Sequence, residues 1–529
     1  MTEAAPLLAQ LEAVVGAQNC LRGEAAQALY TDVYRALATP LAVIRPQAVE
    51  QVQEVVRITA SHDRRLTVRG GGASYTDGYL AEDESALILD LSALDRVVEI
   101  NEEDCFVTVE PGVTWAALSE ALAGRGWRTP FRGPFSGLHA TVGGSMSQNA
   151  ISHGSGSYGI SAESALSFDV ITASGELLRT GSAAAGCEPF ARHFGPDLTG
   201  LFTGDCGALG IKVRITLPLL RARPAHRVAS FAFPSFSAMH EAMRRIARER
   251  LEDSQFALDQ ALSQGQIARQ DNAGESLRLA WSIFRSSPSV AAGIAQLARA
   301  ATSARRQIGQ AAYTVHYIVE GVDDGEARSR LHRIRQLVQD DGQEVAATVP
   351  AVVRDMPFAP FFNTLGPAGE RWVPLHGVLP HSRVNKFHDA LQDLYRQRRE
   401  ELEAHGIWYG GMFATVGSSG FLYEIALYWP DEITAYHRAV VPADYLAQLP
   451  THAANPVARD LVDALKRELA ELYAQHGATN FQIGRFYPYA ERLEQEPAQL
   501  LQAIKTHLDP SQRLSPGVLG LGKDTSASR

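Results

Sequence analysis

The chain has few cysteines, and its charged residues show no basic excess. Only four cysteines occur in 529 residues, at Cys20, Cys105, Cys187 and Cys206, and none belongs to a CxxC pair. This wide spacing predicts neither a disulfide framework nor a zinc site. The net charge of −10 argues against a general nucleic-acid binder, which would present a basic surface.

Long apolar runs are also missing. No uncharged stretch reaches the roughly 18 apolar residues of a membrane span, and the opening MTEAAPLLAQLEAVVG lacks a basic leader before an apolar segment. We therefore expect a cytoplasmic protein with no membrane association. No GxGxxG motif opens a helix, so a nicotinamide site of the Rossmann type is not expected.

The composition is that of a globular protein, with 45% hydrophobic and 20% charged residues, and the length favours two domains. The first part alternates strands and helices. Apolar spacing predicts helices over 46–60 and 115–125, and strands over 66–69, 86–91 and 105–112.

A change of composition follows at 131–159, which is rich in Gly, Ser and His and is expected to be a long functional loop. The segment 168–175 predicts a strand that returns through a hairpin at Ser174 and Gly175. Another strand is expected over 211–217.

The second half differs in composition, with Arg- and Ala-rich segments typical of helices between segments typical of strands. We expect helices over 237–252 and 290–310, strands over 313–321 and 421–429, and further helices from 456 onward. This order predicts an α+β domain with an antiparallel sheet.

Three glycines follow the first expected strand in the sequence RGGGASY, Arg69 to Tyr75. Glycine tolerates positive φ and lets backbone N–H groups converge on an anion, and Ser74 adds a hydroxyl. A plain glycine turn would also explain the triplet.

A second glycine pair, Gly143 and Gly144, opens the run TVGGSMSQNAISHGSGSYG, from Thr141 to Gly159. Small residues allow backbone to approach a flat ligand, while their N–H and O–H groups can bind phosphates and ring heteroatoms. A solvated loop is the alternative interpretation.

Taken together and in this order, four segments resemble the vanillyl-alcohol oxidase and p-cresol methylhydroxylase family of FAD-dependent oxidoreductases. The resemblance covers nearly the whole chain. The segments are VVEINEEDCFVTVEPGVTWAAL, TVGGSMSQNA followed by HGSGSYG, GPDLTGLFTGDCGALGI, and LDPSQRLSPG.

The resemblance implies an α+β fold in which a two-subdomain PCMH-type FAD-binding domain carries an inserted α+β cap. The N-terminal FAD-binding part would span 1–224, the cap 225–455 and the C-terminal return 456–529. The residues implied to bind FAD are Arg69, Gly70, Gly71, Gly72, Ala73, Ser74, Tyr75, Pro111, Gly112, Thr141, Val142, Gly143, Gly144, Ser147, Asn149, Gly154, Gly156 and Ile211.

Departures from the family pattern concern the flavin linkage. Some relatives attach the flavin to a histidine in the first glycine loop, where this chain has Ala73. Others use a His or Tyr on a cap strand, and Tyr423 stands near that place. A tyrosine packed within the cap is the alternative for Tyr423.

The phenol-oxidising members use an acidic base near the second loop, where this chain has Ser152 and His153. They also hold a phenolate with a Tyr/Arg cluster. This cluster is not reproduced residue for residue, although Arg485 and Tyr487 stand close to its place.

Relatives that act on 2-hydroxy acids use an arginine for the carboxylate, and often a metal held by cap histidines with an EHG motif. The segment VPLHGVLPHSR supplies His376, His381 and Arg383, but no EHG motif follows. We therefore expect no metal.

The resemblance implies hydride transfer from a CH–OH or benzylic group to the flavin, which needs a base and a group that holds an anion. A histidine with a pKa near neutrality suits the first role and an arginine the second. The candidate catalytic residues are Tyr75, His153, Arg383, Tyr423, Arg485 and Tyr487.

A phenolic or benzylic alcohol or an alkylphenol is the expected substrate, and a 2-hydroxy acid is the alternative. A non-redox flavin synthase and an electron-carrying FAD subunit are further alternatives. Molecular oxygen or a cytochrome-type protein would reoxidise the flavin. We expect a homodimer, because dimers are the commonest oligomers of soluble proteins.

Overall fold

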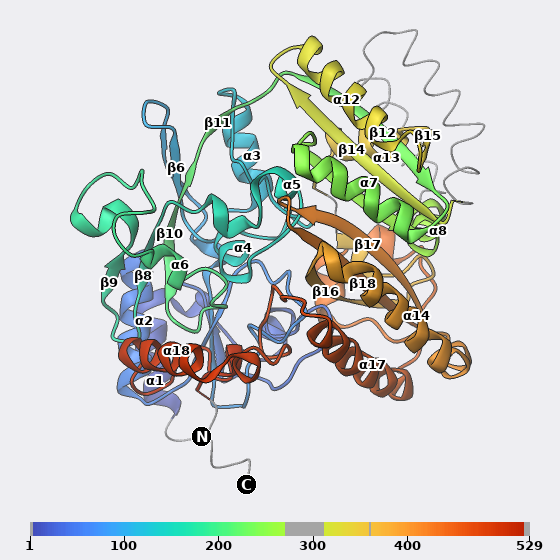
Figure 1. Cartoon of the computed structure of the whole chain (residues 1–529). Helices are drawn as coiled ribbons and strands as arrows, with labels where there is room; N and C mark the ends of the chain where they lie inside the picture. The colour runs from blue at the N-terminus through green and yellow to red at the C-terminus, as the bar shows by residue number, and fades with distance from the viewer. Residues whose placement is uncertain (1–3, 270–310, 359–360, 523–529) are drawn as a thin grey trace.

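The computed structural model describes residues 4–269, 311–358 and 361–522. Four sheets organise this part of the chain, three of them with four or more strands and one with only two. Two small sheets and their helices form the N-terminal body, and one large sheet forms a second body beside it (Figure 1).

The first sheet has four strands in the order β1-β2-β4-β3, with β2, β4 and β3 parallel. Helices α1 and α2 pack on it through buried Leu and Val side chains. Its elements are α1 (Ala4–Val15), β1 (Cys20–Leu21), β2 (Ala42–Ile44), α2 (Val49–Ser61), β3 (Leu66–Arg69) and β4 (Leu87–Asp90).

The second sheet is antiparallel, in the order β5-β6-β10-β8-β9. The expected hairpin at Ser174 and Gly175 is confirmed, because β8 and β9 pair across it. The elements of this sheet and its surroundings are β5 (Val97–Asn101), β6 (Phe106–Val109), α3 (Trp115–Ala123), β8 (Ser167–Ile171), β9 (Leu177–Arg179), α6 (Leu198–Leu201) and β10 (Ile211–Pro218). The short strands β7 (Trp127–Arg128) and β11 (Leu220–Arg221) pair with each other in a separate antiparallel sheet.

The segment 131–159 is not the continuous loop that we expected. It contains the short helices α4 (Val142–Gln148) and α5 (Ser155–Tyr158). The hydroxyl of Thr141 accepts a hydrogen bond from the Gly144 N–H at 3.2 Å and so caps α4. Glycine and serine composition misled the prediction, because tertiary packing outweighs the weak helix propensity of these residues.

The third sheet has seven strands in the order β15-β12-β14-β13-β17-β18-β16, with every neighbouring pair antiparallel. It forms the cap expected from the second half of the sequence. The strands are β12 (Ala225–Phe233), β13 (Ser254–Asp259), β14 (Tyr313–Gly321), β15 (Gln343–Val345), β16 (Arg371–Pro380), β17 (Trp408–Val416) and β18 (Gly420–Trp429).

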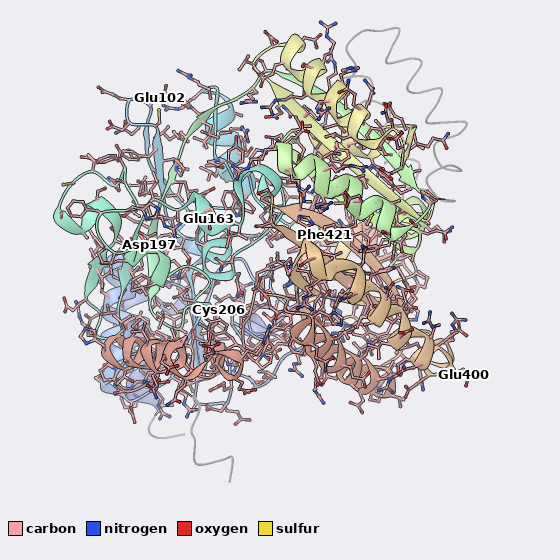
Figure 2. The ribbon with its side chains drawn as sticks, in the orientation of Figure 1. Glu102, Glu163, Asp197, Cys206, Glu400 and Phe421 are labelled. Carbon is pink, nitrogen blue, oxygen red and sulfur yellow. The ribbon has the colours of Figure 1, made fainter. Side chains whose placement is uncertain are left out.

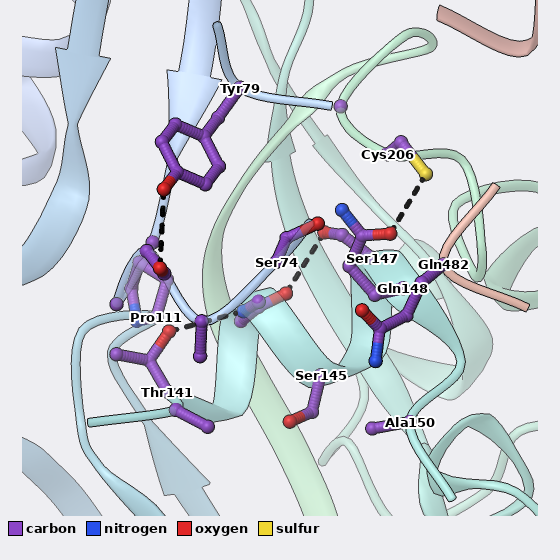
Figure 3. Close-up of a pocket in the computed structure, with 18 of the residues that line it drawn as sticks. Ser74, Tyr79, Pro111, Thr141, Ser145, Ser147, Gln148, Ala150, Cys206 and Gln482 are labelled. Atoms are coloured by element: carbon purple, nitrogen blue, oxygen red, sulfur yellow. Dashed lines mark hydrogen bonds between the residues drawn. The ribbon is translucent and has the colours of Figure 1, made fainter. Parts of the chain in front are cut away.

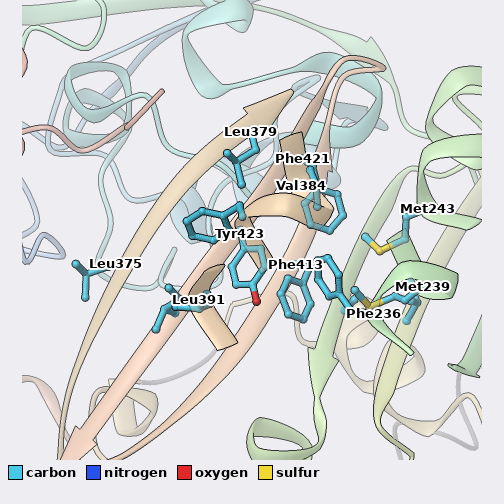
Figure 4. Packing of buried hydrophobic residues seen from close by; sticks show 14 of the residues in the cluster. Phe236, Met239, Met243, Leu375, Leu379, Val384, Leu391, Phe413, Phe421 and Tyr423 are labelled. Carbon is cyan, nitrogen blue, oxygen red and sulfur yellow. The ribbon is translucent and has the colours of Figure 1, made fainter. Parts of the chain in front are cut away.

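Helices cover one face of this cap sheet. Phe413 and Tyr423 pair across β17 and β18, and they pack with Phe236 in the same apolar core (Figure 4). The helices of this second body are α7 (Phe236–Glu249), α8 (Gln260–Arg269), α12 (Asp324–Val338), α13 (Thr348–Asp355), α14 (His381–Ala404), α15 (Ala435–Val440), α16 (Ala443–Leu446) and α17 (Pro456–Gln475). Because side chains alternate along a strand, the neighbours of Phe413 and Tyr423 point to the opposite face.

The strands expected over 313–321 and 421–429 correspond to β14 and β18. The helix expected over 237–252 ends earlier, at Glu249, because Arg250 adopts a left-handed conformation with φ 48°. The helix expected over 290–310 lies outside the described residues.

We expected the chain to return to the N-terminal body at 456, but it does not do so there. Helix α17 packs on β16, β18 and α14 of the cap, and the side chain of Tyr473 lies in the cap core. Helix α18 (Gln495–Leu508) follows on the other body. The C-terminal motif then reaches the first sheet, where Leu514 bridges to Leu66 of β3.

Buried charges join the two bodies. Arg128 and Arg132 of the N-terminal body form ion pairs with Asp253 of the cap, at 2.9 Å for Arg128, and Arg132 also reaches Glu320 at 3.2 Å. Figure 2 marks the N-terminal body with Cys206 and the cap with Phe421. Among the described helices, none is both long and apolar enough to cross a bilayer.

Candidate functional site

A cavity lies between the first two sheets, at the end of β3 (Figure 3). The space within it, including the open mouth, is about 910 Å³. The expected FAD-binding residues that line it are Gly70, Gly71, Gly72, Ala73, Ser74, Pro111, Thr141, Gly143, Gly144 and Ser147.

The first glycine loop requires glycine because it presses against the second loop. A Cβ atom on Gly71 would lie 1.8 Å from the carbonyl oxygen of His139. Gly72 has φ +73°, and a Cβ there would meet the guanidinium of Arg69. The triplet is therefore not an exchangeable turn, and its backbone forms one wall of the cavity.

The second loop approaches in the same way. A Cβ atom on Gly143 would lie 2.5 Å from Pro111, which stands two residues after the end of β6. Thr141 holds this approach in place through its hydrogen bond to the Gly144 N–H. The result is a narrow cradle of backbone and small polar side chains.

The chemistry of this cradle fits a dinucleotide. The lining combines glycine backbone, the hydroxyls of Ser74 and Ser147, and the buried cation of Lys212. Lys212 is held by Asp205, with Nζ and Oδ1 2.6 Å apart. Backbone N–H groups and a buried cation suit the phosphates of a dinucleotide, and the flat space between small residues suits its rings.

Eight of the expected FAD-binding residues lie outside the lining. Two of them have contacts elsewhere: Arg69 pairs with Asp90 at 3.0 Å, and a Cβ atom on Gly156 would meet the Glu252 carboxyl. These eight residues are Arg69, Tyr75, Gly112, Val142, Asn149, Gly154, Gly156 and Ile211.

Other lining residues were not singled out from the sequence. Cys206 and Gly207 lie within a motif that carried the family resemblance, and both have positive φ, at 49° and 76°. That conformation marks a tight approach which the sequence does not display. The further lining residues are Val68, Tyr79, Leu91, Pro134, Ser136, Ala140, Ser145, Gln148, Ala150, Ile151, Gly210, Lys212 and Gln482.

At Ile151 and Gln482 the cavity wall meets the cap. Ile151 packs with Leu422 and Phe481 in a small apolar cluster, and Leu422 stands on the face of β18 opposite to Tyr423. The inner face of the cap sheet therefore adjoins the cavity.

A polar cluster stands on this inner face. The hydroxyl of Tyr75 and Nε2 of His376 are 3.0 Å apart, and the His376 ring stacks on Phe481 with centroids 3.7 Å apart. The Tyr487 hydroxyl lies 3.2 Å from the His376 carbonyl oxygen, to which it donates. Desolvation raises the pKa of both tyrosines and lowers the pKa of His376 to about 3, so all three are neutral near pH 7.

Glu424 is the acid of this cluster, and nothing in the sequence pattern singled it out. It lies directly opposite His376 on β16 and Met412 on β17, so these side chains share the inner face. Desolvation raises the pKa of the Glu424 carboxyl to about 7. The negative charge of Glu424 contributes to the raised pKa values of its neighbours Tyr75 and Tyr487.

His153 is not placed as the base that we expected. Its Nε2 donates to the Pro357 carbonyl at 2.9 Å, and its Nδ1 lies 3.0 Å from the Ser254 hydroxyl. Burial, aided by Arg132, lowers its pKa to about 4. Both ring nitrogens are thus used within the protein, and the side chain is not part of the cavity lining.

The two arginines proposed as anion holders are also placed elsewhere. Arg485 donates to the carbonyl oxygens of Asp77 at 2.6 Å, Leu80 at 2.9 Å and Pro516 at 2.8 Å. Arg383 lies on the exposed surface of α14. Neither guanidinium faces the cavity.

Tyr423 points away from the cavity. Its hydroxyl lies 2.9 Å from Nδ1 of His388 on α14, and its ring packs in the cap core (Figure 4). The alternation of β18 sends Glu424, rather than Tyr423, to the inner face. Tyr423 is therefore a packed cap tyrosine in this structure.

The cap histidines are separated as well. His376 bonds to Tyr75, whereas His381 bonds to His240 on the far side of the sheet, with ring nitrogens 3.1 Å apart. Within the ranges that the structure describes, no group of three or more His, Cys, Asp or Glu side chains is arranged to hold a metal.

Comparison with known proteins bears on the cavity first. Residues 40–181 match the model of the FAD binding domain family. A D-2-hydroxyglutarate dehydrogenase of Xanthomonas citri pv. viticola is 31% identical over 224 residues, which cover 42% of this chain and 46% of that protein. A glycolate oxidase subunit of Bacillus subtilis is 29% identical over 215 residues, covering 40% and 44%. The chain thus spans about half the length of these curated relatives.

The fold comparison extends over the whole chain. The structure of p-cresol methylhydroxylase with substrate bound has a TM-score of 0.72 at 18% identity and covers 98% of this chain and 97% of that one. The fold and the cavity define an FAD-binding protein. More particularly, residues 40–181 form an FAD-binding domain, FAD is the cofactor, and the chain shares the α+β fold of p-cresol methylhydroxylase.

Proposed function

We propose that the protein is an FAD-dependent oxidoreductase that oxidises an uncharged phenolic or benzylic alcohol, or an alkylphenol. One observation carries the proposal: the FAD cavity adjoins a cap face that offers hydroxyls and one acid. Tyr75, Tyr487 and Glu424 form this polar group, and the two arginines expected to hold an anion lie elsewhere.

Charge favours a neutral substrate over a carboxylate. An ionised Glu424 in a poorly hydrated site repels a second carboxylate, and this repulsion is strong where the effective dielectric constant is low. The hydroxyls of Tyr75 and Tyr487 can instead exchange hydrogen bonds with a neutral hydroxyl.

A 2-hydroxy acid remains the second candidate because the curated relatives act on such compounds. Their names are D-2-hydroxyglutarate dehydrogenase and glycolate oxidase. The match covers about half of the length of each relative. Their substrate therefore bears less on this chain than the charge of its own cap face.

The residues of this chain bind and orient the substrate, while bound FAD supplies the acceptor for two electrons. Tyr75 and Tyr487 would fix the substrate hydroxyl. The apolar side chains of Ile151, Leu422 and Phe481 would exclude water beside them, which strengthens each polar interaction in the site.

An electron-carrying subunit and a non-redox flavin synthase are weaker alternatives, since neither needs an acid beside tyrosine hydroxyls. In our proposal, molecular oxygen or a cytochrome-type protein accepts the electrons. A cytoplasmic location and a homodimer complete this proposal.

The proposal is tested by anaerobic mixing of the FAD-loaded protein with 4-hydroxybenzyl alcohol, 4-ethylphenol, glycolate and D-2-hydroxyglutarate in parallel. Bleaching of the flavin absorbance by the first two compounds is expected. Bleaching by the two acids alone would transfer the assignment to the second candidate. No bleaching by any compound would contradict an oxidoreductase of either kind.

A further inference from the structure

The inner face of the cap sheet contains one carboxyl group without a partner beside the FAD cavity. Among the described residues, Glu424 forms no hydrogen bond or ion pair, and its pKa is raised by desolvation alone. Part of its surface is nevertheless accessible. Strong desolvation together with partial accessibility indicates a carboxyl group that faces an internal space rather than bulk water.

The groups packed around Glu424 keep this space uncharged. Tyr75 comes from the first glycine loop, His376 from β16 and Tyr487 from the C-terminal segment. The charge of Glu424 also contributes to the raised pKa of Tyr473 on α17. The pKa values of the tyrosines are raised and that of His376 is lowered, so Glu424 is the member of this group whose charge changes near neutrality.

A second acid offers a comparison within the same body. Glu252 is also buried, and desolvation raises its pKa to about 7. Its Oε1 accepts a hydrogen bond from the Thr415 hydroxyl at 3.4 Å, and it packs against Gly156. Neither carboxyl is part of the cavity lining itself, but Glu252 has local partners, whereas Glu424 has none among the described residues and shares its strand face with Leu422, which packs on the lining residue Ile151. Glu424 is therefore the acid available to a substrate.

We propose that Glu424 is the catalytic base of the oxidation, taking the proton of the substrate hydroxyl while the Tyr75 and Tyr487 hydroxyls hold the substrate oxygen. This inference rests on the proposed function. Glu424 would take the role of the acidic base that the related enzymes have near the second loop, where this chain has Ser152 and His153.

The step balances for an alcohol substrate. The O–H bond breaks and its proton passes to the Glu424 carboxylate, while the C–H bond breaks and its hydrogen passes with the electron pair to the oxidised flavin. A carbon–oxygen double bond forms, so the alcohol is oxidised and the flavin is reduced. The protonated Glu424 then loses its proton to solvent when the product leaves.

The test compares wild type with Glu424→Gln and with the matched control Glu252→Gln, all loaded with FAD. Anaerobic reduction by 4-hydroxybenzyl alcohol is followed from pH 5 to pH 9. The wild-type and Glu252→Gln rates should rise tenfold per pH unit below pH 7 and then level off. The Glu424→Gln rate should be 10²- to 10⁴-fold lower, which is about the usual contribution of general base catalysis, and independent of pH.

Infrared spectra provide a readout without turnover. The carboxylic acid absorption that disappears between pH 5 and pH 9 should lose one component in each variant. Only the component missing from Glu424→Gln should shift when the reaction product, 4-hydroxybenzaldehyde, is bound to the wild type.

The outcomes separate the two proposals. Fast, pH-dependent reduction of Glu424→Gln would overturn Glu424 as the base and leave the oxidoreductase assignment standing. Failure of the wild type to be reduced by any substrate of the panel would overturn both. If Glu424→Gln does not retain FAD, Glu424→Ala replaces it, and a rate and pH profile equal to those of wild type would again overturn the proposal.

Discussion

The hydroxyl of Tyr75 and Nε2 of His376 lie 3.0 Å apart, and this contact joins the first glycine loop to strand β16 of the cap. Tyr75 immediately follows the loop that lines the FAD cavity. His376 lies opposite Glu424 across β16 and β18. The cofactor cradle and the proposed substrate site are thus connected through one hydrogen bond.

Replacing Tyr75 by Phe should destabilise the protein by about 1–3 kcal/mol, because it leaves a buried ring nitrogen of His376 without a partner. Nδ1 of His376 already has none among the described residues. Urea unfolding measures the change. Tyr395→Phe is the matched control, since the buried Tyr395 hydroxyl has no hydrogen-bond partner within the described ranges and its loss should be neutral or stabilising. Equal effects of both substitutions would contradict the role of this contact.

Gly71→Ala should abolish FAD retention. The added methyl group would lie 1.8 Å from the His139 carbonyl oxygen, so the two loops that form the cradle must separate. The ratio of flavin to protein absorbance after purification should fall at least tenfold. Gly124→Ala is the control because its Cβ would meet nothing within 4 Å and its φ is −62°. A fully yellow Gly71→Ala protein would refute the placement of the cofactor.

The flavin should be released when the protein is precipitated with acid. Ala73 cannot form a covalent link, and Tyr423 faces His388 and the cap core rather than the cavity. Absorbance of the supernatant measures the released flavin, and Tyr423→Phe should release the same fraction. Retention by wild type with release from Tyr423→Phe would show that Tyr423 is bound to the flavin.

The stability of the protein should fall between about pH 4.5 and pH 7 through Glu424. Its pKa is raised from 4.5 to about 7 on folding, so the unfolded chain loses this proton first and ionisation then favours unfolding. The effect is complete above pH 7 and amounts to at most about 3 kcal/mol.

Denaturant unfolding at pH 5 and pH 8 measures this effect in wild type and Glu424→Gln. The difference between the two proteins should move in favour of the variant as the pH rises. Glu400→Gln, at an exposed position of α14, provides a control that should show no such change. A difference that is constant with pH would contradict the raised pKa of Glu424.

The sequence by itself determined the two glycine loops, and its resemblance to a known family predicted the fold and the cofactor. The loops depend on residues close together in the chain: three glycines directly after a strand, and the pair Gly143 and Gly144 among small polar residues. Local steric rules act over a few residues and are therefore visible in a sequence.

Only the tertiary structure decided which polar side chains meet at the cavity. Tyr75 and His376 are 301 positions apart, and no local pattern can report their contact. Strand alternation sends Glu424 inward and Tyr423 outward, and a shift of one residue in register would exchange them. The buried side chains of His153 and Arg485 likewise donate hydrogen bonds to backbone carbonyl oxygens. Buried polar groups need hydrogen-bond partners, and the sequence does not show which partners lie within reach.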